Sequence, residues 1–468
     1  MSSFGCTRRG FLKAIGLSAA AMAVQGCAGA SGRGSRKILA DDPNIVFVLA
    51  DDLGWAELGC YGNGFNETPN LDRLAREGMR FTDAYSAAPV CSPFRAALMT
   101  GQYPARVGIT DYLRPNDPKC LSSDYVTITE ALKRAGYTTG IIGKWHLTGY
   151  ANHGAEESPP NVHGFDEVIV SENRGIGGGS YFYPYQFNRE IKQRIDGKEY
   201  LVDRCNLEAI EFIERHKDKP FFLYLSHYAI HTGLVGKDEL VAKYEKKPGA
   251  GKGNNAMRNN PHLAAQIESI DEGIGMITRK LDELGLAGNT VLIFTSDNGG
   301  EDRVTSNSPL RAGKSTLYEG GIREPLIVRW PGVVKAGSVC KTQMSTIDFY
   351  PTFLDFAGLK AESGQILDGV SLLPLLKDEK AKLARDTLYW HYPLAKPHFL
   401  GGRSAGAIRH SDWKLIEFFD DGAAELYNLA DDISEKHNLA DNMPGKTTEL
   451  RKRLAKWRAE VGAKGANE

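Results

Sequence analysis

The sequence predicts an α/β fold: a large, mostly parallel sheet sandwiched by helices, followed by a smaller C-terminal α+β domain built on a short antiparallel sheet. Three observations support this prediction. Apolar, strand-like segments alternate with helix-like segments from residue 43 to residue 380, which is typical of βαβ units. Several strand-like segments are continuous apolar runs, as expected for strands buried on both faces. Beyond residue 380 the segments become short and are separated by turns.

Five apolar segments are predicted as strands of the large sheet. They are residues 45–50 (IVFVLA), 138–143 (TTGIIG), 221–226 (FFLYLS), 291–296 (VLIFTS) and 325–330 (PLIVRW). Between and after them, helices are predicted at 68–77, 127–136, 207–216, 262–284 and 347–356. Two of these helices have recognisable starts. Pro69 suits the first helical position behind Thr68, and Thr127 with Glu130 forms a capping-box pattern.

The C-terminal part is predicted to be a separate domain. Short strand-like segments lie at 387–392, 406–409, 413–418 and 425–428, and a last helix lies at 447–461. A chain of 468 residues is too long for one hydrophobic core, which rarely grows past about 250–300 residues. We therefore assign residues 43–380 to an α/β catalytic domain and residues 381–468 to the antiparallel-sheet domain.

The overall charge excludes one class of partner. The net charge is −1 and the isoelectric point is about 6.8, without the basic stripe that nucleic-acid-binding proteins carry. The protein is therefore not expected to bind nucleic acid. A net charge near zero also gives little long-range attraction for an anion, so an anion site must be made by local residues.

Residues 1–27 resemble an export signal of the twin-arginine type. Arg8 and Arg9 lie in the sequence TRRGFLK, and an apolar run follows at residues 14–24. This run is far shorter than the ~20 residues of a membrane span. We expect export by the twin-arginine machinery to the periplasm or cell envelope, with residues 28–42 as a flexible tether.

Cys27 is a candidate lipidation site. The sequence VQGC at residues 24–27 is similar to a lipobox, although Gln25 is unusual there. The expectation is a lipid anchor on Cys27 that holds the protein at the membrane. The alternative is cleavage by an ordinary signal peptidase near the Ala/Gly cluster, which would release a periplasmic protein.

Five cysteines lie beyond the signal region: Cys60, Cys91, Cys120, Cys205 and Cys340. They include no CxxC pair, so no zinc site is predicted. In an oxidising envelope, one or two disulfides could join four of them and leave one over. Cys91 is the candidate for the remaining thiol.

Residues capable of chemistry follow four of the predicted strands. Ligands bind beyond the carboxyl ends of the strands in open α/β sheets, so these residues are expected to form one site. They are Asp51, Asp52, Lys144, His146, His227, His231, Asp297 and Asn298.

The oxygen ligands in this set predict a hard cation. Asp51 and Asp52 follow one apolar strand, and Asp297 and Asn298 follow another. With no Cys or His between them, these side chains suit Ca²⁺ better than zinc, with Mg²⁺ or Mn²⁺ as lesser options. Taken alone, the first pair could equally be a solvated turn, but the second pair favours a metal site.

The basic residues predict an anion site. Lys144 and His146 are two residues apart and would face the same side of an extended segment, which suits one anion held by both. The alternative is that they lie on the surface. His231 is either a site residue or a histidine that caps the core, and His227 is expected to be structural.

Cys91 has neighbours that a core cysteine does not need. Ser92 is predicted as a helix cap, with Pro93 at the first helical position and Arg95 one turn in. Cys91 would then lie at the positive end of this helix, where a thiol is easily ionised. Arg95 would add a guanidinium suited to a tetrahedral oxyanion. Ca²⁺ prefers oxygen to a thiolate, however, so the site requires an oxygen nucleophile where the sequence supplies sulfur.

Ordered motifs around these residues identify a family. Cys91-x-Pro93-x-Arg95 is followed by LMTG at 98–101, and further motifs are ADDLG at 50–54, GKWH at 143–146, SDNG at 296–299 and GKSTLYEGG at 313–321. The set resembles the type I sulfatases, arylsulfatase-like enzymes of the alkaline phosphatase superfamily. In that family the cysteine is converted to formylglycine, which implies a formylglycine-generating enzyme as a partner. Phe94 departs from the family's usual Ser, Thr or Ala, and conversion is still expected.

The resemblance implies a role for each matching residue. One Ca²⁺ ion would be held by Asp51, Asp52, Asp297, Asn298 and formylglycine 91. One hydroxyl of the hydrated aldehyde would attack sulfur, with Asp297 accepting its proton and Arg95 holding the diol and the cation in register. Lys144 and Lys314 would stabilise charge on the sulfate, and His231 with Lys314 would protonate the leaving oxygen. His146 would be the base that releases sulfate in the second step.

Other interpretations remain open. Without the resemblance, residues 308–318, which include Lys314, would be taken for an ordinary surface loop. The first alternative function is a phosphohydrolase or phosphonate hydrolase on the same fold, disfavoured because the strand ends supply too few histidines for a second metal. The second is a catalytically silent glycan-binding lipoprotein, which an unmodified Cys91 would imply.

Export and lipid anchoring favour a sulfated glycan over a small aryl sulfate as the substrate. Lys144, His231 and Lys314 are the candidate substrate-binding residues. Residues 181–185 (YFYPY) are either a sugar-stacking platform or a packed hairpin. Further candidates for the substrate cleft are Arg174, His153, His391 and His398, among which the sequence does not decide.

Overall fold

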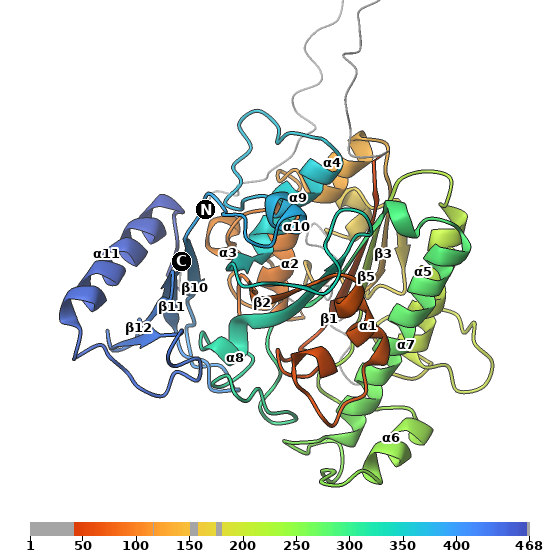
Figure 1. Ribbon diagram of the computed structural model, residues 1–468, viewed down its shortest axis with the longest axis horizontal. Coiled ribbons are helices and arrows are strands. Elements are labelled where there is room, and N and C mark those ends of the chain that lie inside the picture. The colour runs from red at the N-terminus through yellow and green to blue at the C-terminus, as the bar shows by residue number, and fades with distance from the viewer. Residues whose placement is uncertain (1–41, 116, 150–157, 175–179, 466–468) are drawn as a thin grey trace, which may run out of the picture. The chain divides into compact units, whose positions relative to one another are not determined.

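The computed structural model describes residues 42–115, 117–149, 158–174 and 180–465. The expected export signal, the lipidation candidate Cys27, nearly all of the tether and His153 lie outside these residues. The described residues are coloured from red to blue along the chain in Figure 1. Among them, no helix combines the length and the apolar composition that crossing a bilayer requires.

Nine of the described strands form the large sheet. Their bounds are β1 Asn44–Ala50, β2 Met79–Tyr85, β3 Thr138–Gly143, β4 Glu167–Ile169, β5 Phe221–Ser226, β6 Thr290–Ser296, β7 Arg323–Arg329, β8 Ser338–Cys340 and β9 Met344–Ser345. The spatial order is β4-β3-β5-β1-β6-β7-β2-β8, and β9 pairs with β2. Neighbours from β4 to β6 are parallel, whereas β7 runs antiparallel to both β6 and β2. The sheet is therefore mostly parallel, as predicted.

All five predicted strands are present, and four strands were not predicted. β2 (MRFTDAY) mixes polar and apolar residues, so its sequence lacks the continuous apolar run of a central strand. It lies near the sheet edge, between β7 and the short strands β8 and β9. β4, β8 and β9 have only three, three and two residues, too few to produce a periodic pattern.

Alternate residues of the central strand β1 face opposite layers. Ile45, Phe47 and Leu49 belong to one hydrophobic cluster, and Val46 and Val48 belong to the other. Side chains of a strand point alternately to its two faces, so a strand covered on both faces is apolar at every position. This packing explains the uninterrupted apolar run in the sequence.

Helices cover both faces of the large sheet (Figure 1). The cluster that contains Phe47 receives side chains from α2 Cys91–Thr100, α4 Ile128–Arg134, α9 Phe349–Phe356 and α10 Leu373–Lys377. The cluster that contains Val46 receives side chains from α1 Pro69–Glu77, α5 Leu201–Arg215 and α7 Pro261–Glu283. Three further helices precede the second sheet: α3 Pro104–Val107, α6 Asp238–Glu245 and α8 Glu319–Ile322. The sandwich predicted from the sequence is confirmed.

The start of α4 is the predicted capping box. The Thr127 hydroxyl accepts the backbone N–H of Glu130, and the Glu130 carboxylate accepts the backbone N–H of Thr127. Pro69 occupies the first position of α1, also as predicted. The Thr68 hydroxyl, however, makes no capping bond. Asp271 of α7 accepts N–H groups of the first turn of α1 instead, which ties α1 to α7.

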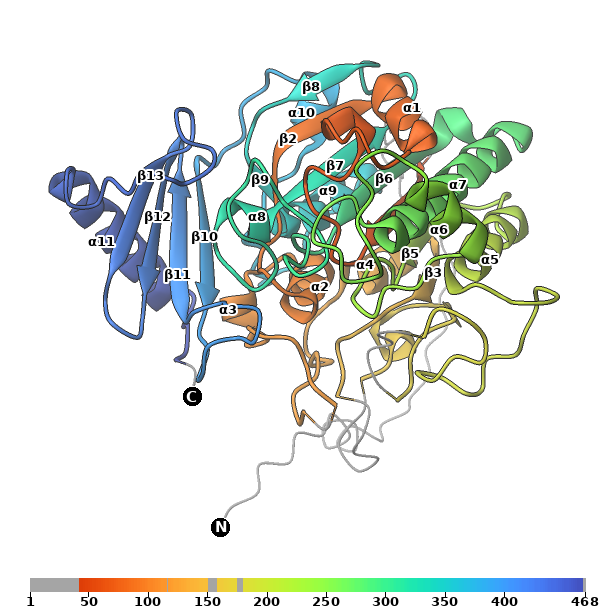
Figure 2. The ribbon, with the colours of Figure 1, turned by 90° about the horizontal axis from the view of Figure 1, so that it is seen from below.

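A second sheet of four antiparallel strands follows the large one. Its strands are β10 Thr387–Tyr392, β11 Ala405–His410, β12 Trp413–Phe418 and β13 Ala424–Asn428, in that order. Helix α11 Pro444–Glu460 packs on one face of this sheet (Figure 2). Leu450, Leu454 and Trp457 of α11 share a hydrophobic cluster with Ile408 and Leu415 of the strands. The predicted antiparallel sheet and last helix are confirmed.

No disulfide forms among the cysteines that the structure describes. Cys91, Cys205 and Cys340 are buried thiols, and Cys60 is half-buried. The one or two disulfides that the sequence left open are therefore not formed.

A buried ion pair anchors the segment that leads into the second sheet. Arg385 donates to both carboxylate oxygens of Asp348, each at 2.6 Å. Removing one partner of a buried ion pair leaves the other charge uncompensated, which costs about 3–5 kcal/mol. We therefore expect Arg385→Met to lower the free energy of unfolding by about 3–5 kcal/mol, as measured by urea denaturation.

The matched control is Arg403→Met. Arg403 also binds two carboxylate groups, those of Asp420 and Asp421, but all three side chains are about one third to one half exposed. Solvent screens an exposed pair of this kind, so its loss should change the free energy of unfolding far less. If both substitutions lowered the free energy of unfolding equally, burial would not be what makes the Arg385 pair stabilising.

Candidate active site

The carboxyl ends of four parallel strands meet at one edge of the large sheet. Ala50 of β1 lies opposite Ser296 of β6, and Gly143 of β3 lies opposite Ser226 of β5. Leu49 of β1 lies opposite the same Ser226 of β5, so β1 and β5 also end next to each other. The residues that follow these four strands are therefore neighbours in space, as the position of ligand sites in open α/β sheets predicts.

Three buried carboxylates form the centre of the site. Oxygen atoms of Asp51, Asp52 and Asp297 all lie within 4.8 Å of one another. Asn298 donates from Nδ2 to Asp52 Oδ1 at 2.7 Å. Its own Oδ1 atom is buried and has no hydrogen-bond partner among the residues that the structure describes. A buried oxygen without a donor, beside three carboxylates, fits the ligand set of a hard cation.

Three buried cations balance the three carboxylates. The pairs are Arg95 with Asp297 at 3.0 Å, Lys144 with Asp51, and Lys314 with Asp52 at 2.7 Å. The six charges cancel. A divalent cation held by the carboxylates would give the site two net positive charges, which would attract an oxyanion.

The carboxylates differ in their affinity for protons. Burial alone would raise the pKa of Asp51, but Lys144 and the other nearby cations outweigh it and lower this pKa below its ordinary value. Burial and the negative charge of Asp51 raise the pKa of Asp297 to about 6. Asp297 is therefore the carboxylate better suited to accept a proton near neutral pH.

Cys91 begins α2, so the predicted cap is wrong. The helix starts at Cys91 itself, with Val90 before it, and the Ser92 hydroxyl accepts the N–H of Leu113 instead of a helix N–H. Cys91 Sγ lies 3.7 Å from Asp51 Oδ1. Burial and the charge of Asp51 raise the pKa of the thiol to about 12, despite the nearby Lys144. The expectation of an easily ionised thiol is thus also wrong, because burial dominates.

Arg95 connects the strand ends to one another. Its Nη1 donates to Lys144 O at 2.7 Å and to Ser226 Oγ at 2.6 Å. Its Nη2 donates to Asp297 at 3.0 Å and contacts Asp51 at 3.4 Å. The guanidinium is buried and holds protein groups, rather than forming the oxyanion site suggested by the sequence.

Lys144 and His146 follow β3 and contact different groups of the site. His146 has a φ of 54°, in the left-handed region, so the segment is not regularly extended. Lys144 Nζ reaches Asp51, whereas His146 Nε2 donates to Leu113 O at 2.9 Å. Both side chains are buried, so the surface alternative is also excluded.

His231 faces the carboxylate cluster. Its Nε2 is 3.9 Å from Asp52 Oδ2, and its side chain is 18% exposed, unlike a histidine sealed in the core. Burial and the cation of Lys314 lower the pKa of His231 to about 4. His227 is fully buried, and burial lowers its pKa to about 3, which agrees with a structural role.

The segment that carries His231 is supported by Tyr181. The Tyr181 hydroxyl donates to the carbonyl groups of Tyr228 and His231. Tyr181 and Tyr185 are buried, which favours packing over sugar stacking for residues 181–185. Among the aromatic residues of this segment, only Tyr183 is exposed, at 37%.

Lys314 is buried, so the surface-loop interpretation of its segment is wrong. Its backbone N–H donates to Gly300 O at 3.0 Å. Gly313 permits this approach, because a Cβ atom at that position would lie 2.2 Å from Gly300 O. The loop that follows Asp297 and Asn298 therefore holds Lys314 directly.

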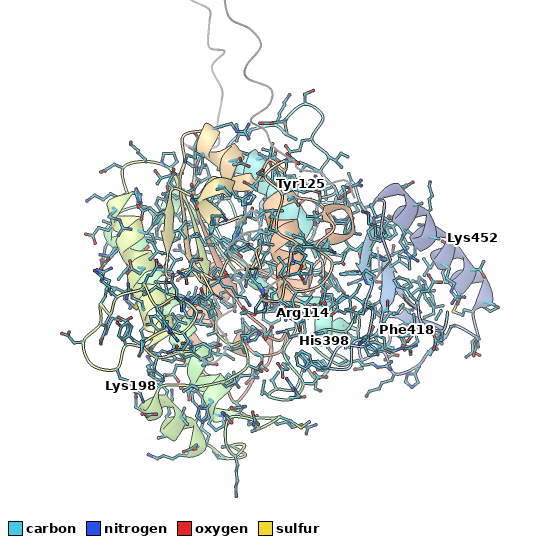
Figure 3. All side chains as sticks on the ribbon, turned by 180° about the vertical axis from the view of Figure 1, so that it is seen from behind. Arg114, Tyr125, Lys198, His398, Phe418 and Lys452 are labelled. Atoms are coloured by element: carbon cyan, nitrogen blue, oxygen red, sulfur yellow. The ribbon has the colours of Figure 1, made fainter. Side chains whose placement is uncertain are left out.

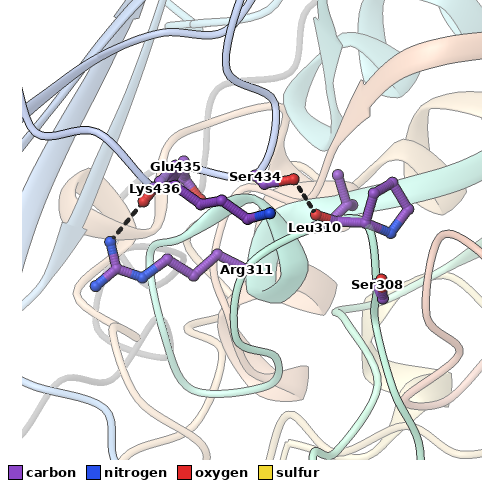
Figure 4. Close-up of a pocket in the computed structure, with 7 residues that line it drawn as sticks. Ser308, Leu310, Arg311, Ser434, Glu435 and Lys436 are labelled. Atoms are coloured by element: carbon purple, nitrogen blue, oxygen red, sulfur yellow. Dashed lines mark hydrogen bonds between the residues drawn. The ribbon is translucent and has the colours of Figure 1, made fainter.

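The C-terminal part of the chain holds the other side of the Lys314 loop (Figure 4). Arg311 Nη1 donates to Glu435 O at 2.8 Å, and Ser434 Oγ donates to Pro309 O at 2.7 Å. These two segments line a pocket that contains none of the residues assigned to the reaction. Beyond the loop, Lys414 of β12 is buried between the carboxylates of Glu319 and Glu435. The second sheet thus holds Glu319, the first residue of α8, five residues after Lys314.

Three residues at the site adopt left-handed backbone angles although they are not glycine. They are Asp52, His146 and Ser315, with φ values of 65°, 54° and 72°. Such angles cost energy for residues that carry a Cβ, and the surrounding structure must hold them. The bonds that do so run from Asp52 N to Asp297, from His146 N to Glu172, and from Ser315 N to Pro89 O.

Glu172 is a functional residue that the sequence analysis missed. Its buried carboxylate accepts the backbone N–H groups of Trp145 and His146, at 3.0 and 2.6 Å. It also accepts the hydroxyl of Tyr228 at 2.7 Å. One carboxylate therefore joins the segment of His146 to the segment of His231. Glu172 lies three residues past the end of β4, a strand of three residues that was not predicted, so this strand end was not recognised in the sequence.

Glu172→Gln should disturb both segments without removing a group that contacts the substrate. A glutamine of the same shape offers one acceptor oxygen, and its NH₂ group would face backbone donors. We expect kcat to fall about tenfold with little change in KM, because catalytic groups misplaced by a fraction of an ångström lose rate before affinity. Glu190→Gln, at an exposed position, is the control. A change in thermal stability with unaltered kcat would indicate a merely structural role.

Other predicted residues contact groups outside the carboxylate cluster. Arg174 is exposed, and its recorded bond is a backbone bond to Phe187. His391 Nε2 donates to Lys464 O in the C-terminal part. His398 packs its ring against Tyr112, with ring centroids 5.6 Å apart. Of these candidates, His398 alone connects to a residue beside the helix of Cys91.

The fold and this constellation define a hydrolase of sulfate esters, and comparison with known proteins gives the family. The sulfatase family model matches residues 43–359, and the model for the C-terminal region of N-sulphoglucosamine sulphohydrolase matches residues 312–460. The chain belongs to the sulfatase family, within the alkaline phosphatase superfamily.

Individual relatives agree with this assignment. A sulfatase of Formosa agariphila is 32% identical over 479 aligned positions, which cover 87% of this chain and 86% of that protein. The N-acetylgalactosamine-6-sulfatase of Mus musculus is 36% identical, over 71% of this chain and 66% of that enzyme. The crystal structure of Ps i-CgsB in complex with k-i-k-neocarrahexaose matches with a TM-score of 0.77 and 33% identity, over 89% of this chain and 92% of that one.

Proposed function

We propose that this sulfatase removes sulfate from sulfated carbohydrates, using formylglycine at position 91 and one Ca²⁺ ion. The observation that carries the proposal is the buried cluster in which Cys91, three carboxylates and two lysines meet. Two relatives support the substrate class by their names: one acts on a 6-sulfated amino sugar, and the other was crystallised with an oligosaccharide.

The donor set of the cluster supports a bound Ca²⁺ ion. Asp51, Asp52, Asp297 and Asn298 would hold it, and the buried Asn298 Oδ1 has no other partner. When bound, the ion would supply positive charge beside the sulfate oxygens.

Position 91 requires chemistry that a thiol does not offer here. Formylglycine, as a hydrated aldehyde, would supply the oxygen nucleophile. Asp297, with its raised pKa, would accept the nucleophile's proton. Arg95 would keep Asp51 and Asp297 in place through its two contacts with them.

Lys144 and Lys314 would bind the sulfate group. Each amine already pairs with a carboxylate of the cluster, so a sulfate placed there would share both cations. Their positive charges would stabilise the negative charge that accumulates on the sulfate oxygens in the transition state.

Two histidines would move protons. His231 would protonate the leaving oxygen, and the negative charge of a bound sulfate ester would favour the protonated ring that this step needs. His146 donates its Nε2 proton to Leu113 O, which leaves Nδ1 as the atom able to accept one. His146 would therefore serve as the base in the release of sulfate.

The test of the proposal combines mass spectrometry with turnover. Protein made in a host that has a formylglycine-generating enzyme is digested, and the fragment that contains position 91 is weighed. We expect the mass of an aldehyde in place of the thiol, together with sulfate release from a sulfated sugar. An intact Cys91 in every molecule would refute the proposal and favour the glycan-binding alternative.

Removal of Ca²⁺ should abolish turnover. Dialysis against a chelator would leave three carboxylates and three cations that only neutralise one another, so the attraction for sulfate would weaken. We expect a loss of at least about a hundredfold, because metal charge stabilisation is worth several kcal/mol. Added Ca²⁺ should restore activity better than Mg²⁺, which demands a stricter octahedral geometry. Full activity in chelator would contradict the metal assignment.

Export is a further part of the proposal. The twin-arginine-like residues and Cys27 support an exported, lipid-anchored enzyme in the cell envelope. Fractionation of the native host should place the protein with the membrane, and Cys27→Ala should release it into the periplasm. If the wild-type protein and Cys27→Ala were found in the same fraction, Cys27 would not be the anchor, and cleavage by ordinary signal peptidase would be favoured.

A further inference from the structure

We propose that five residues around the mouth of the site form a subsite for the sugar units of a sulfated saccharide. These residues, here called the rim, are Tyr112, Arg114, Arg303, His398 and Phe399. The inference rests on the proposed function and extends it, because it names the surface that distinguishes a sulfated saccharide from a small sulfate ester.

The first segment of the rim borders Cys91 and His146. Leu113 donates its N–H to Ser92 Oγ at 3.0 Å and accepts the Nε2 proton of His146 at 2.9 Å. Tyr112 and Arg114 flank Leu113 in sequence. They therefore lie beside the first turn of α2 and beside the proposed base.

The second segment of the rim borders Lys314. His398 donates its N–H to Gly402 O at 2.8 Å. Gly402 lies so close to Ser315, the neighbour of Lys314, that a Cβ atom there would be 1.9 Å from Ser315 O. The turn from His398 to Gly402, which comes from the C-terminal part, thus rests on the Lys314 loop.

The third segment of the rim follows the metal-ligand candidates. Arg303 lies three residues beyond Gly300, whose carbonyl accepts the N–H of Lys314. Arg303 Nε donates to the Glu301 carboxylate at 2.6 Å. Each of the three segments therefore lies next to a different part of the reaction centre.

Side chains of the three segments contact one another. The Tyr112 ring meets the His398 ring at 5.6 Å between centroids, and the His398 ring lies 4.4 Å from that of Phe399. The Arg114 guanidinium lies 4.1 Å over the Tyr112 ring, and the Arg303 guanidinium lies 5.2 Å from the Phe399 ring. The labels of Arg114 and His398 are adjacent near the centre of the view in Figure 3. The rim is thus one surface.

The chemistry of the rim suits a sulfated sugar. Phe399 is 68% exposed, the largest exposed fraction among the large hydrophobic side chains that the structure describes. An aromatic face carries negative potential and packs against the C–H groups of a pyranose ring. Arg114 and Arg303 are each more than half exposed. A carboxylate holds one edge of each guanidinium, and its remaining N–H donors can bind further sulfate groups.

The test compares two kinds of substrate. Phe399→Ala, Arg303→Gln and Arg114→Gln are assayed on 4-nitrophenyl sulfate and on a panel of sulfated saccharides that includes N-acetylgalactosamine 6-sulfate and neocarrahexaose. We expect kcat/KM on the best saccharide to fall about tenfold per variant, chiefly through KM, as for lost binding contacts. The loss on 4-nitrophenyl sulfate should be several times smaller, because it carries no sugar. Ile366→Ala and Arg189→Ala, at exposed positions outside the rim, are the matched controls.

Three outcomes would overturn the rim while leaving the sulfatase proposal intact. They are equal losses on both kinds of substrate, no loss on saccharides, and a wild-type enzyme that accepts 4-nitrophenyl sulfate but no saccharide of the panel.

A second measurement separates the two proposals. Binding of the same saccharides to Cys91→Ser is followed by isothermal titration calorimetry, which needs no turnover. A converted wild-type enzyme that hydrolyses no sulfate ester would defeat the proposed function, yet weaker saccharide binding by the rim variants would still support the rim. Unchanged binding would defeat the rim as well.

Discussion

Cys91→Ala and Cys91→Ser should each reduce sulfate release by at least about ten-thousandfold, the scale of losing a covalent nucleophile. The serine variant is the more informative of the two. It supplies an oxygen of nearly the same size at the start of α2, but as a single hydroxyl. An unmodified serine lacks the second hydroxyl of the aldehyde hydrate, whose loss of a proton would release sulfate in the second step. The measurement is kcat/KM for the best sulfated saccharide and for 4-nitrophenyl sulfate.

The control for this prediction is Cys60→Ser. Cys60 is a half-buried thiol outside the site, with a pKa also raised to about 12 by burial and by Asp72. Activity should survive this substitution, which separates the role of position 91 from a general need for thiols. Comparable turnover by Cys91→Ser and the wild type would mean that a hydroxyl suffices, and the formylglycine proposal would then be falsified.

His231→Ala should show a loss that depends on the leaving group. A sugar alkoxide needs a proton as it leaves, whereas 4-nitrophenolate is stable without one. We expect a loss of about a hundredfold to ten-thousandfold on a sulfated saccharide, the usual range for general acid catalysis. On 4-nitrophenyl sulfate the loss should be below about tenfold, because only the contribution of the ring to positioning disappears.

The pH dependence gives a second readout for His231. Burial and Lys314 lower its pKa to about 4 in the free enzyme, so the fraction of protonated ring falls as the pH rises above that value. In the wild type, kcat/KM on a saccharide should therefore decline with rising pH. In His231→Ala this limb of the profile should vanish. Equal losses on both substrates, with an unchanged profile, would assign His231 to binding instead of proton transfer.

His398→Ala is the control that separates loss of proton transfer from general damage caused by removing a histidine ring. His398→Ala alters a ring that packs against Tyr112 but makes no recorded contact with the carboxylates. Its effect should fall on KM for saccharides, unlike the effect on kcat expected for His231→Ala.

The large sheet was predictable because its central strands are buried on both faces. Such strands are apolar at every position, which makes β1, β5 and β6 visible as continuous runs. β2 was missed because it lies near the sheet edge, where half-polar sequences are tolerated. Its direction follows from pairing with β7, a long-range contact that leaves no local pattern.

The site was predictable to the extent that it lies at strand ends. Asp51, Asp52, Asp297 and Asn298 come together because the carboxyl ends of β1 and β6 are adjacent. The direction of a side chain is not given by its position in the sequence. His146 has a left-handed backbone angle, and its ring donates to Leu113 O, a bond that its spacing from Lys144 does not predict. This conformation depends on bonds to Glu172, which no local pattern announces.

The burial of position 91 determines whether its modification comes before or after folding. Every residue of α2 is buried, and Cys91 is only 2% exposed in the folded protein. An enzyme that oxidises this side chain must enclose it, and cannot do so once the helix is covered on all sides. Modification would therefore have to precede folding, on a nascent or unfolded chain. The chain would have one brief opportunity, and a molecule that folded first would remain inactive however long it later met the modifying enzyme.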